Sequence, residues 1–129
     1  MYRKKTLEKK VASLQSSLFS RGLPVSRDWI RTKILATPKC TYCGQLIEIQ
    51  SYSADHIIPL NRKGKNIEAN IQLIDVGCNR MKNDLTDEEF RALMGFLSEY
   101  PEMYKNVRAR LRAGGGFIHG YNKRFVRND

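Results

Sequence analysis

The chain has 129 residues and lacks most features of membrane, secreted or disulfide-bonded proteins. It has no apolar run of about 18 or more residues, the length that a membrane-spanning helix needs. Its first ten residues, MYRKKTLEKK, lead into no hydrophobic stretch of the signal-peptide kind, so we expect a cytoplasmic protein without membrane contact. It has three cysteines, an odd number, which argues against a disulfide framework and favours a metal site or buried thiols.

Acidic residues are also scarce, with 13 Asp and Glu against 23 Lys and Arg and a formal net charge of +10. A field of this sign attracts polyanions such as nucleic acids. Residues 1–39 hold ten basic and two acidic side chains, whereas residues 40–84 hold five of each. This segregation favours a basic, substrate-gripping arm beside a locally acidic, cation-binding centre.

Hydrophobic spacing predicts helices at both ends of the chain. Apolar residues three or four apart predict an amphipathic helix over residues 3–20, and Ser26 can cap a second helix that reaches Ala36. Further on, Thr86 and Glu89 form a capping box for another helix, and a last one follows Pro101. Between these ends, β-branched and aromatic runs predict strands around residues 47–52, 54–58 and 70–74, followed by a short helix over 77–83.

The chemistry-bearing residues lie in this middle stretch. Asp55 and His56 are adjacent in SADHIIPL, Asn70 opens NIQLI fourteen residues after His56, and Asn79 follows in CNRMK. A single Asp–His pair or a lone Asn is more typical of structural hydrogen bonding. Together with a preceding C-x-x-C pair, the arrangement over residues 40–82 resembles the HNH endonuclease family, in the variant that ends on Asn instead of a second His.

The resemblance implies an α+β fold with a ββα-metal (His-Me finger) core. The first strand of a hairpin would carry Asp55 and His56, the second would start at Asn70, and a helix would present Asn79. We therefore expect one compact domain made of a basic N-terminal helical arm (1–39), the HNH core (40–85), a C-terminal helical pair (86–113) and a basic flexible tail (114–129).

The resemblance also implies hydrolysis of DNA phosphodiester bonds to 5′-phosphate and 3′-hydroxyl ends. A histidine side chain can take a proton from water near neutral pH, so His56 suits a general base that activates water. Asp55 and Asn79 offer the oxygen ligands that Mg²⁺ or Mn²⁺ prefers. In the family pattern Asn70 supports the loop and orients the histidine, so we place it with His56 in the catalytic set.

The cysteines suggest a second, structural metal site. Cys40 and Cys43 are spaced as half of a zinc site, and Cys78 with Asp75 stands where relatives have a second cysteine pair. A Cys3Asp zinc site is one interpretation, with His119 as an alternative fourth ligand, and three merely buried thiols are the other.

Contacts with double-stranded DNA are expected from basic residues of the arm and of the core. Lys82 is the first candidate for the scissile phosphate because it lies close to Asn79 in sequence. The full set is Lys4, Lys5, Lys9, Lys10, Arg21, Arg27, Arg31 and Lys33 in the arm, and Arg62, Lys63, Lys65, Arg80 and Lys82 in the core.

Two alternatives remain open at this stage. One is a non-catalytic, zinc-stabilised nucleic-acid-binding module on the same scaffold, since a fold does not guarantee a function. The other is a nuclease for RNA or branched DNA. Stand-alone family members of this size resemble those of phages and mobile elements, which implies a phage packaging or replication partner. The oligomeric state stays open.

Overall fold

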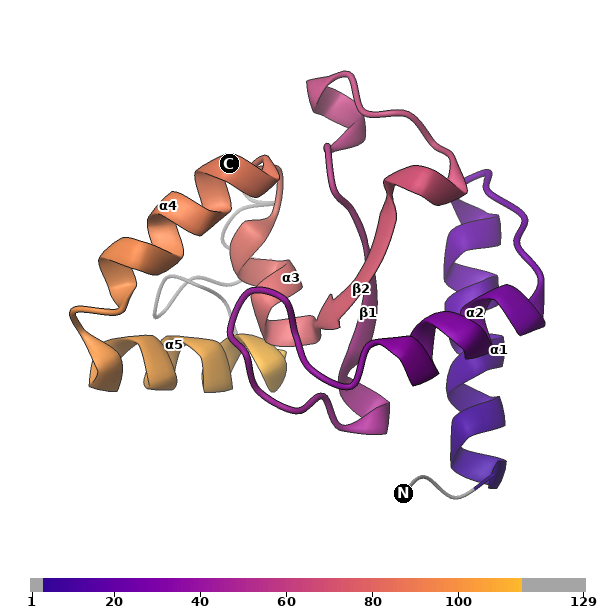
Figure 1. The fold of residues 1–129 in the computed structure, drawn as a ribbon, viewed down its shortest axis with the longest axis horizontal. Coiled ribbons are helices and arrows are strands. Elements are labelled where there is room, and N and C mark those ends of the chain that lie inside the picture. Colours follow the sequence, from indigo (N-terminus) through magenta and orange to yellow (C-terminus); the bar gives the residue numbers. More distant parts are fainter. Residues whose placement is uncertain (1–3, 115–129) are drawn as a thin grey trace, which may run out of the picture.

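A two-stranded antiparallel sheet lies at the centre of the computed structural model, which describes residues 4–114 (Figure 1). α1 and α2 lie on one side of the sheet, and α3, α4 and α5 lie on the other (Figure 1). The prediction of an α+β fold is confirmed. The elements are, in order, α1 (Lys4–Ser20), α2 (Arg27–Ala36), β1 (Tyr52–His56), β2 (Ile71–Asp75), α3 (Val76–Lys82), α4 (Asp87–Leu97) and α5 (Pro101–Arg112), with short 3₁₀ turns at Ile49–Ser51, Leu60–Arg62 and Glu68–Asn70.

The strands and α3 form a continuous ββα unit. β1 pairs with β2 so that Tyr52 lies opposite Asp75 and His56 lies opposite Ile71. Asp75 ends β2 and is also the N-cap of α3, because its Oδ2 accepts hydrogen bonds from the backbone N–H groups of Gly77 at 2.8 Å and Cys78 at 3.4 Å. The chain therefore passes from strand to helix without a loop.

The N-terminal helices form a hairpin that covers β1. Val11, Leu14 and Leu18 of α1 are buried, as the apolar spacing predicted, and they pack with Ile30 and Ile34 of α2. The predicted cap is confirmed, since Ser26 Oγ accepts from the N–H of Trp29 at 3.0 Å. The buried Tyr52 then ties β1 to the end of α2, because its hydroxyl donates to the Thr37 carbonyl at 2.7 Å.

The predicted capping box at Thr86 and Glu89 is present at the start of α4. α5 follows and lies against α3, where Gly77 permits a close approach. A Cβ built on Gly77 would lie 3.0 Å from the carbonyl oxygen of Arg108. None of the helices in residues 4–114 combines the length and apolarity needed to cross a bilayer.

One predicted strand is wrong. Residues 47–52 alternate in polarity, but the structure forms a 3₁₀ turn at Ile49–Ser51 and only an isolated bridge between Lys39 and Leu46 before it. Ile47 and Ile49 are buried, so the alternation reported burial correctly. A strand also needs a neighbour for its backbone groups, and β1 is hydrogen-bonded to β2 alone in the described sheet.

The packing at Gly77 predicts opposite effects for two glycine-to-alanine substitutions in helices. Gly77→Ala should lower the free energy of unfolding by about 1–3 kcal/mol, because the new methyl group presses on the α5 backbone. Gly95→Ala in α4 should raise it by about 0.5–1 kcal/mol, because its methyl group meets open space and alanine favours a helix. Urea unfolding measures both; equal shifts of the same sign would contradict the close α3–α5 packing.

Candidate active site

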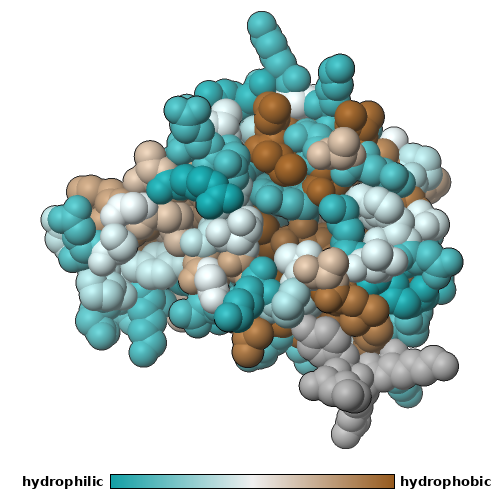
Figure 2. Space-filling view, viewed as in Figure 1, coloured by the Kyte–Doolittle hydropathy of each residue, from teal (hydrophilic) through white to brown (hydrophobic). Residues whose placement is uncertain are grey.

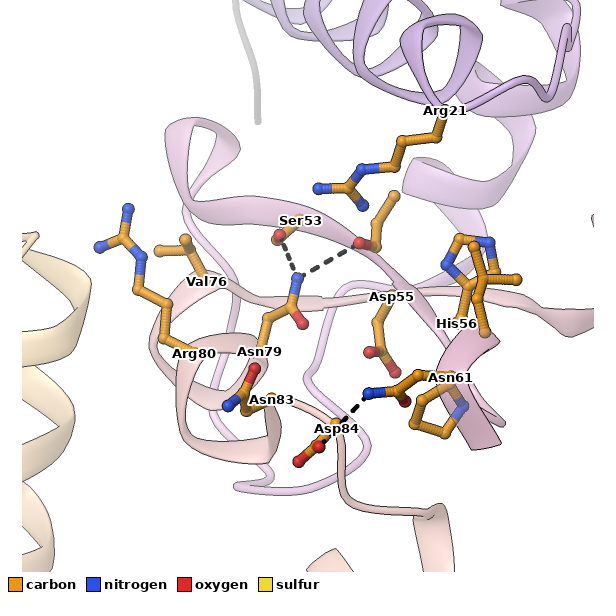
Figure 3. A pocket seen from close by; sticks show the side chains of 13 residues that line it. Arg21, Ser53, Asp55, His56, Asn61, Val76, Asn79, Arg80, Asn83 and Asp84 are labelled. Atoms are coloured by element: carbon orange, nitrogen blue, oxygen red, sulfur yellow. Dashed lines mark hydrogen bonds between the residues drawn. The ribbon is translucent and has the colours of Figure 1, made fainter. Parts of the chain in front are cut away.

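A cleft of about 610 Å³ opens beside the end of β1 and the first turns of α3. Asp55, His56 and Asn79 line it together, as the motif spacing predicted, and Asn70 does not (Figure 3). Further side chains of β1 and of three other segments complete the walls, and the sequence predicted none of them as a base or a metal ligand, although Arg21 was expected to contact the DNA backbone. They are Ser53 from β1, Arg21 from the end of α1, and Asn61, Asn83 and Asp84 from loops.

Asp55 is almost completely buried, with 5% of its surface exposed. Its carboxylate accepts a hydrogen bond from Gln72 Nε2 at 2.9 Å and lies 3.1 Å from the ammonium of Lys82. Burial raises the pKa of Asp55, while Gln72 and the Lys82 charge act against this rise. Because an ionised carboxylate has about four acceptor sites, these two partners leave at least one for a ligand in the cleft.

Asn79 faces Asp55 from the first turn of α3. Its Nδ2 donates to Ser53 Oγ at 2.6 Å and to the Ala54 carbonyl at 3.2 Å. These bonds fix the amide so that its oxygen lies on the Asp55 side (Figure 3). One carboxylate oxygen from β1 and one amide oxygen from α3 therefore face the same space.

His56 is fixed by a residue that the sequence did not single out. Its Nε2 lies 2.8 Å from Oδ1 of Asn66, and the Asn66 Nδ2 donates to the Arg21 carbonyl at 2.9 Å. Because an amide oxygen only accepts, Nε2 carries the proton and Nδ1 keeps its lone pair for the cleft. Asn66 lies in the polar stretch NRKGKN, which has the composition of an ordinary solvated loop.

Asn70 acts on the loop backbone. Its side chain accepts from the Ile58 N–H at 3.0 Å and donates to the carbonyls of Ile58 and Lys65, each at 2.9 Å. Asn70 thus supports the loop as expected. The hydrogen bond of the His56 imidazole, however, is accepted by Asn66 and not by Asn70. Asn70 influences His56 only through the loop that it closes.

A family model described as HNH endonuclease matches residues 40–85. The resemblance of this segment to the HNH endonuclease family is therefore confirmed. The match includes the cysteine pair, both strands, α3 and every residue of the motif. No curated protein matches the chain.

Lys82 lies inside the HNH core, so the prediction that it contacts the scissile phosphate is wrong. Its side chain is 0% exposed. In addition to Asp55, its ammonium bonds the carbonyls of His56 at 3.0 Å and Ile57 at 3.2 Å. The ammonium group faces the protein interior and anchors the end of β1, the strand that carries Asp55 and His56.

The other basic residues predicted to contact DNA fall into two groups. Some already have protein partners: Arg62 binds Glu89, Arg31 binds Glu8 and Asp28, Arg27 binds Gln15, Lys10 binds the Gln50 carbonyl, and Arg80 binds the Leu111 and Arg112 carbonyls. Others are exposed ammonium groups, namely Lys5, Lys9, Lys63 and Lys65. The second group is better suited to bind phosphates, because its charges are not committed to a partner given by the structure. Lys4 begins α1, where only the backbone is described.

The loop that carries Lys63 and Lys65 also exposes apolar surface. Ile58, Leu60 and Ile67 are 47%, 45% and 47% exposed. Figure 2 shows hydrophobic residues at the surface on this end of the HNH core, among polar neighbours. The loop therefore offers both cationic and apolar contacts.

Three cysteines meet on the other side of α3. The sulfurs of Cys40, Cys43 and Cys78 all lie within 4.8 Å of one another. The pKa of Cys40 is lowered because its sulfur accepts hydrogen bonds from the other two thiols, and the pKa of Cys78 is raised because its S–H is donated. The three sulfurs are thus close enough to one another to hold a single metal ion, and sulfur is a ligand that zinc prefers.

The predicted fourth ligand, Asp75, lies outside this cluster. Its carboxylate caps α3 and pairs with Arg112 at 2.8 Å and Arg108 at 3.4 Å. Arg108 also donates to Cys43 Sγ at 3.2 Å, so its guanidinium links Asp75 to the cysteine cluster. The buried Tyr104 hydroxyl has no partner within the described residues. His119, the alternative ligand, lies outside residues 4–114.

The buried ion pair predicts a large cost for removing Lys82. Lys82→Met should destabilise the protein by about 3–5 kcal/mol, because it leaves the Asp55 carboxylate buried without a cation. Lys105→Met, at an exposed position of α5, should change the free energy of unfolding by less than about 0.5 kcal/mol. Urea unfolding separates the two, and a Lys82→Met variant as stable as Lys105→Met would refute the structural role.

Proposed function

We propose that this chain is a metal-dependent DNA endonuclease that hydrolyses phosphodiester bonds. The family match supports a nuclease or nucleic-acid-binding role in general. The observation that carries the finer proposal is the convergence of Asp55, His56 and Asn79 on one open cleft, although they come from two different elements.

The donor set of the cleft fits a hard divalent cation. One carboxylate oxygen and one amide oxygen leave most of an octahedral shell for water and phosphate, which suits Mg²⁺ or Mn²⁺. When bound, such a cation neutralises charge that grows on the phosphate during hydrolysis. The Lys82 ammonium already compensates Asp55, so we expect weak metal binding in the absence of DNA.

His56 serves as the general base in this proposal. Nδ1 takes a proton from a water molecule that attacks phosphorus, and Nε2–H stays bonded to Asn66 while charge develops on the ring. An oriented base of this kind contributes about 10²- to 10⁴-fold to a rate. The expected products are a 5′-phosphate and a 3′-hydroxyl.

DNA would lie across the cleft and contact the exposed lysines. Lys63 and Lys65 extend from the loop after β1, and Lys5 and Lys9 extend from α1. We assign residues 1–39 to gripping the DNA backbone, because their charge balance of ten basic to two acidic groups attracts phosphates without reading bases.

The three cysteines form a second site in the proposal, a structural zinc centre. Zinc prefers thiolate ligands and four-coordinate geometry. Cys40 and Cys43 come from the turn before β1 and Cys78 from α3, so a bound ion would link the two segments. The buried Tyr104 hydroxyl lies beside the cluster and would be a further polar group near such an ion.

Cleavage of supercoiled plasmid tests the nuclease. The protein should nick it in Mg²⁺ or Mn²⁺ and not in EDTA. His56→Ala and Asn79→Ala should lower the rate by at least about 100-fold, because one removes the base and the other a metal ligand. Asn106→Ala, at an exposed position of α5, is the matched control and should cleave like the parent protein.

The same assay decides against the alternatives. DNA binding without cleavage in any divalent cation would point to the non-catalytic module. Faster cleavage of RNA or of a four-way junction than of plasmid would assign the cleft to that substrate.

Metal analysis tests the cysteine site. Protein purified without chelators should contain about one zinc per chain, and Cys78→Ser should lose it together with more than about 10 °C of unfolding temperature. Asp75→Asn should keep the zinc, because Asp75 lies outside the cluster. Loss of zinc in Asp75→Asn would favour the Cys3Asp interpretation. Absence of zinc from the parent protein would show that the cluster consists only of buried thiols.

A further inference from the structure

The end of α1 is held in a rigid turn beside the cleft. The N–H of Leu23 bonds the Leu18 carbonyl at 2.9 Å, and the N–H of Gly22 bonds the Phe19 carbonyl at 2.9 Å. This pair of bonds is a Schellman motif, and Gly22 takes the left-handed conformation that it requires, with φ of +87°. Leu18 and Leu23 are both buried beneath the turn. The backbone of Arg21, the residue before Gly22, is therefore fixed.

A single side chain joins this turn to the candidate base. The Arg21 carbonyl, at the C-terminal end of α1, has no partner within the helix and accepts from Asn66 Nδ2 at 2.9 Å. The Oδ1 of the same Asn66 side chain accepts a hydrogen bond from His56 Nε2 at 2.8 Å. The planar amide of Asn66 thus links His56 to the Arg21 backbone and fixes their relative positions.

The Arg21 side chain is exposed and extends over the cleft that contains Asp55 and Asn79 (Figure 3). In the part of the chain that the structure describes, its guanidinium has no hydrogen-bond or ion-pair partner. Arg80 lines the same cleft, but its guanidinium is committed to the Leu111 and Arg112 carbonyls. Lys82 lies below the cleft and is buried. Arg21 is therefore the uncommitted cation of this cleft.

We propose that Arg21 is a phosphate-binding residue of the active site, so that the N-terminal helical hairpin completes a site whose motif lies in residues 40–85. Its ligand is a non-esterified phosphate oxygen of the nucleic-acid backbone at the position of hydrolysis. The planar fork of a guanidinium matches two such oxygens and neutralises the charge that grows on them. The inference rests on the proposed nuclease function and names a residue of that site.

The ordinary alternative is that Arg21 is a solvated surface charge that contributes only to general attraction of DNA. The two roles differ in their effect on the rate. A residue that only attracts DNA has no effect on the cleavage rate once DNA is saturating. A residue that contacts the reacting phosphate still affects the rate under that condition.

The first measurement follows the arginine Nε–Hε resonances of the full-length protein in EDTA during titration with a short DNA duplex. The Arg21 resonance should shift because its guanidinium meets a phosphate. Arg110, which is exposed on α5 and does not line the cleft, is the internal control and should shift much less.

The second measurement is the single-turnover cleavage rate at saturating plasmid. Arg21→Ala should lower this rate by about 10- to 100-fold, as expected when one charged donor at a developing anion is lost. Arg21→Lys should recover only part of it, because an ammonium lacks the fork. Arg110→Ala should cleave within about twofold of the parent protein.

An Arg21 resonance that does not move, or an Arg21→Ala variant that cleaves at the parental rate, would overturn the inference while the nuclease itself stands. If the parent protein cleaves nothing but its Arg21 resonance shifts with the duplex, the nuclease proposal falls and Arg21 stays a phosphate-binding residue.

Discussion

The buried pair of Lys82 and Asp55 is the interaction on which the rest of the site depends. One ammonium, fully enclosed, bonds the Asp55 carboxylate and the carbonyls of His56 and Ile57. It therefore fixes the end of β1, where Asp55 and His56 lie, against the last residue of α3. Breaking such a pair is costly because the surviving charge stays buried.

Helix α3 shows why such polar anchors are needed. It has only seven residues, too few to be stable as an isolated helix in water. Asp75 caps its first turn and is itself neutralised by Arg108 and Arg112 of α5, while Lys82 secures its last turn. The cysteine cluster adds a third connection through Cys78. Asn79 is thus carried by a helix whose position is determined from both ends.

The helices outside the HNH core contribute directly to the geometry of the cleft. α5 supplies the arginines beside Asp75, and the end of α1 meets His56 through Asn66. The core and its flanking helices therefore form one structural unit around the candidate site. This arrangement explains why the motif, which spans about a third of the chain, does not include every residue that lines the cleft.

The sequence by itself determined the features that rest on local or periodic signals. The helix caps at Ser26 and Thr86, the buried face of α1 and the convergence of Asp55, His56 and Asn79 followed from neighbouring residues or from motif spacing. Only the tertiary structure decided that Lys82 points inward, that Asn66 bonds His56, that Asp75 pairs with arginines of α5 and that residues 47–52 form no strand. These outcomes depend on partners far along the chain, such as Asn66 and Arg21, which are 45 residues apart. A residue's own pattern reports whether it is buried, but its partner is chosen by how the elements pack.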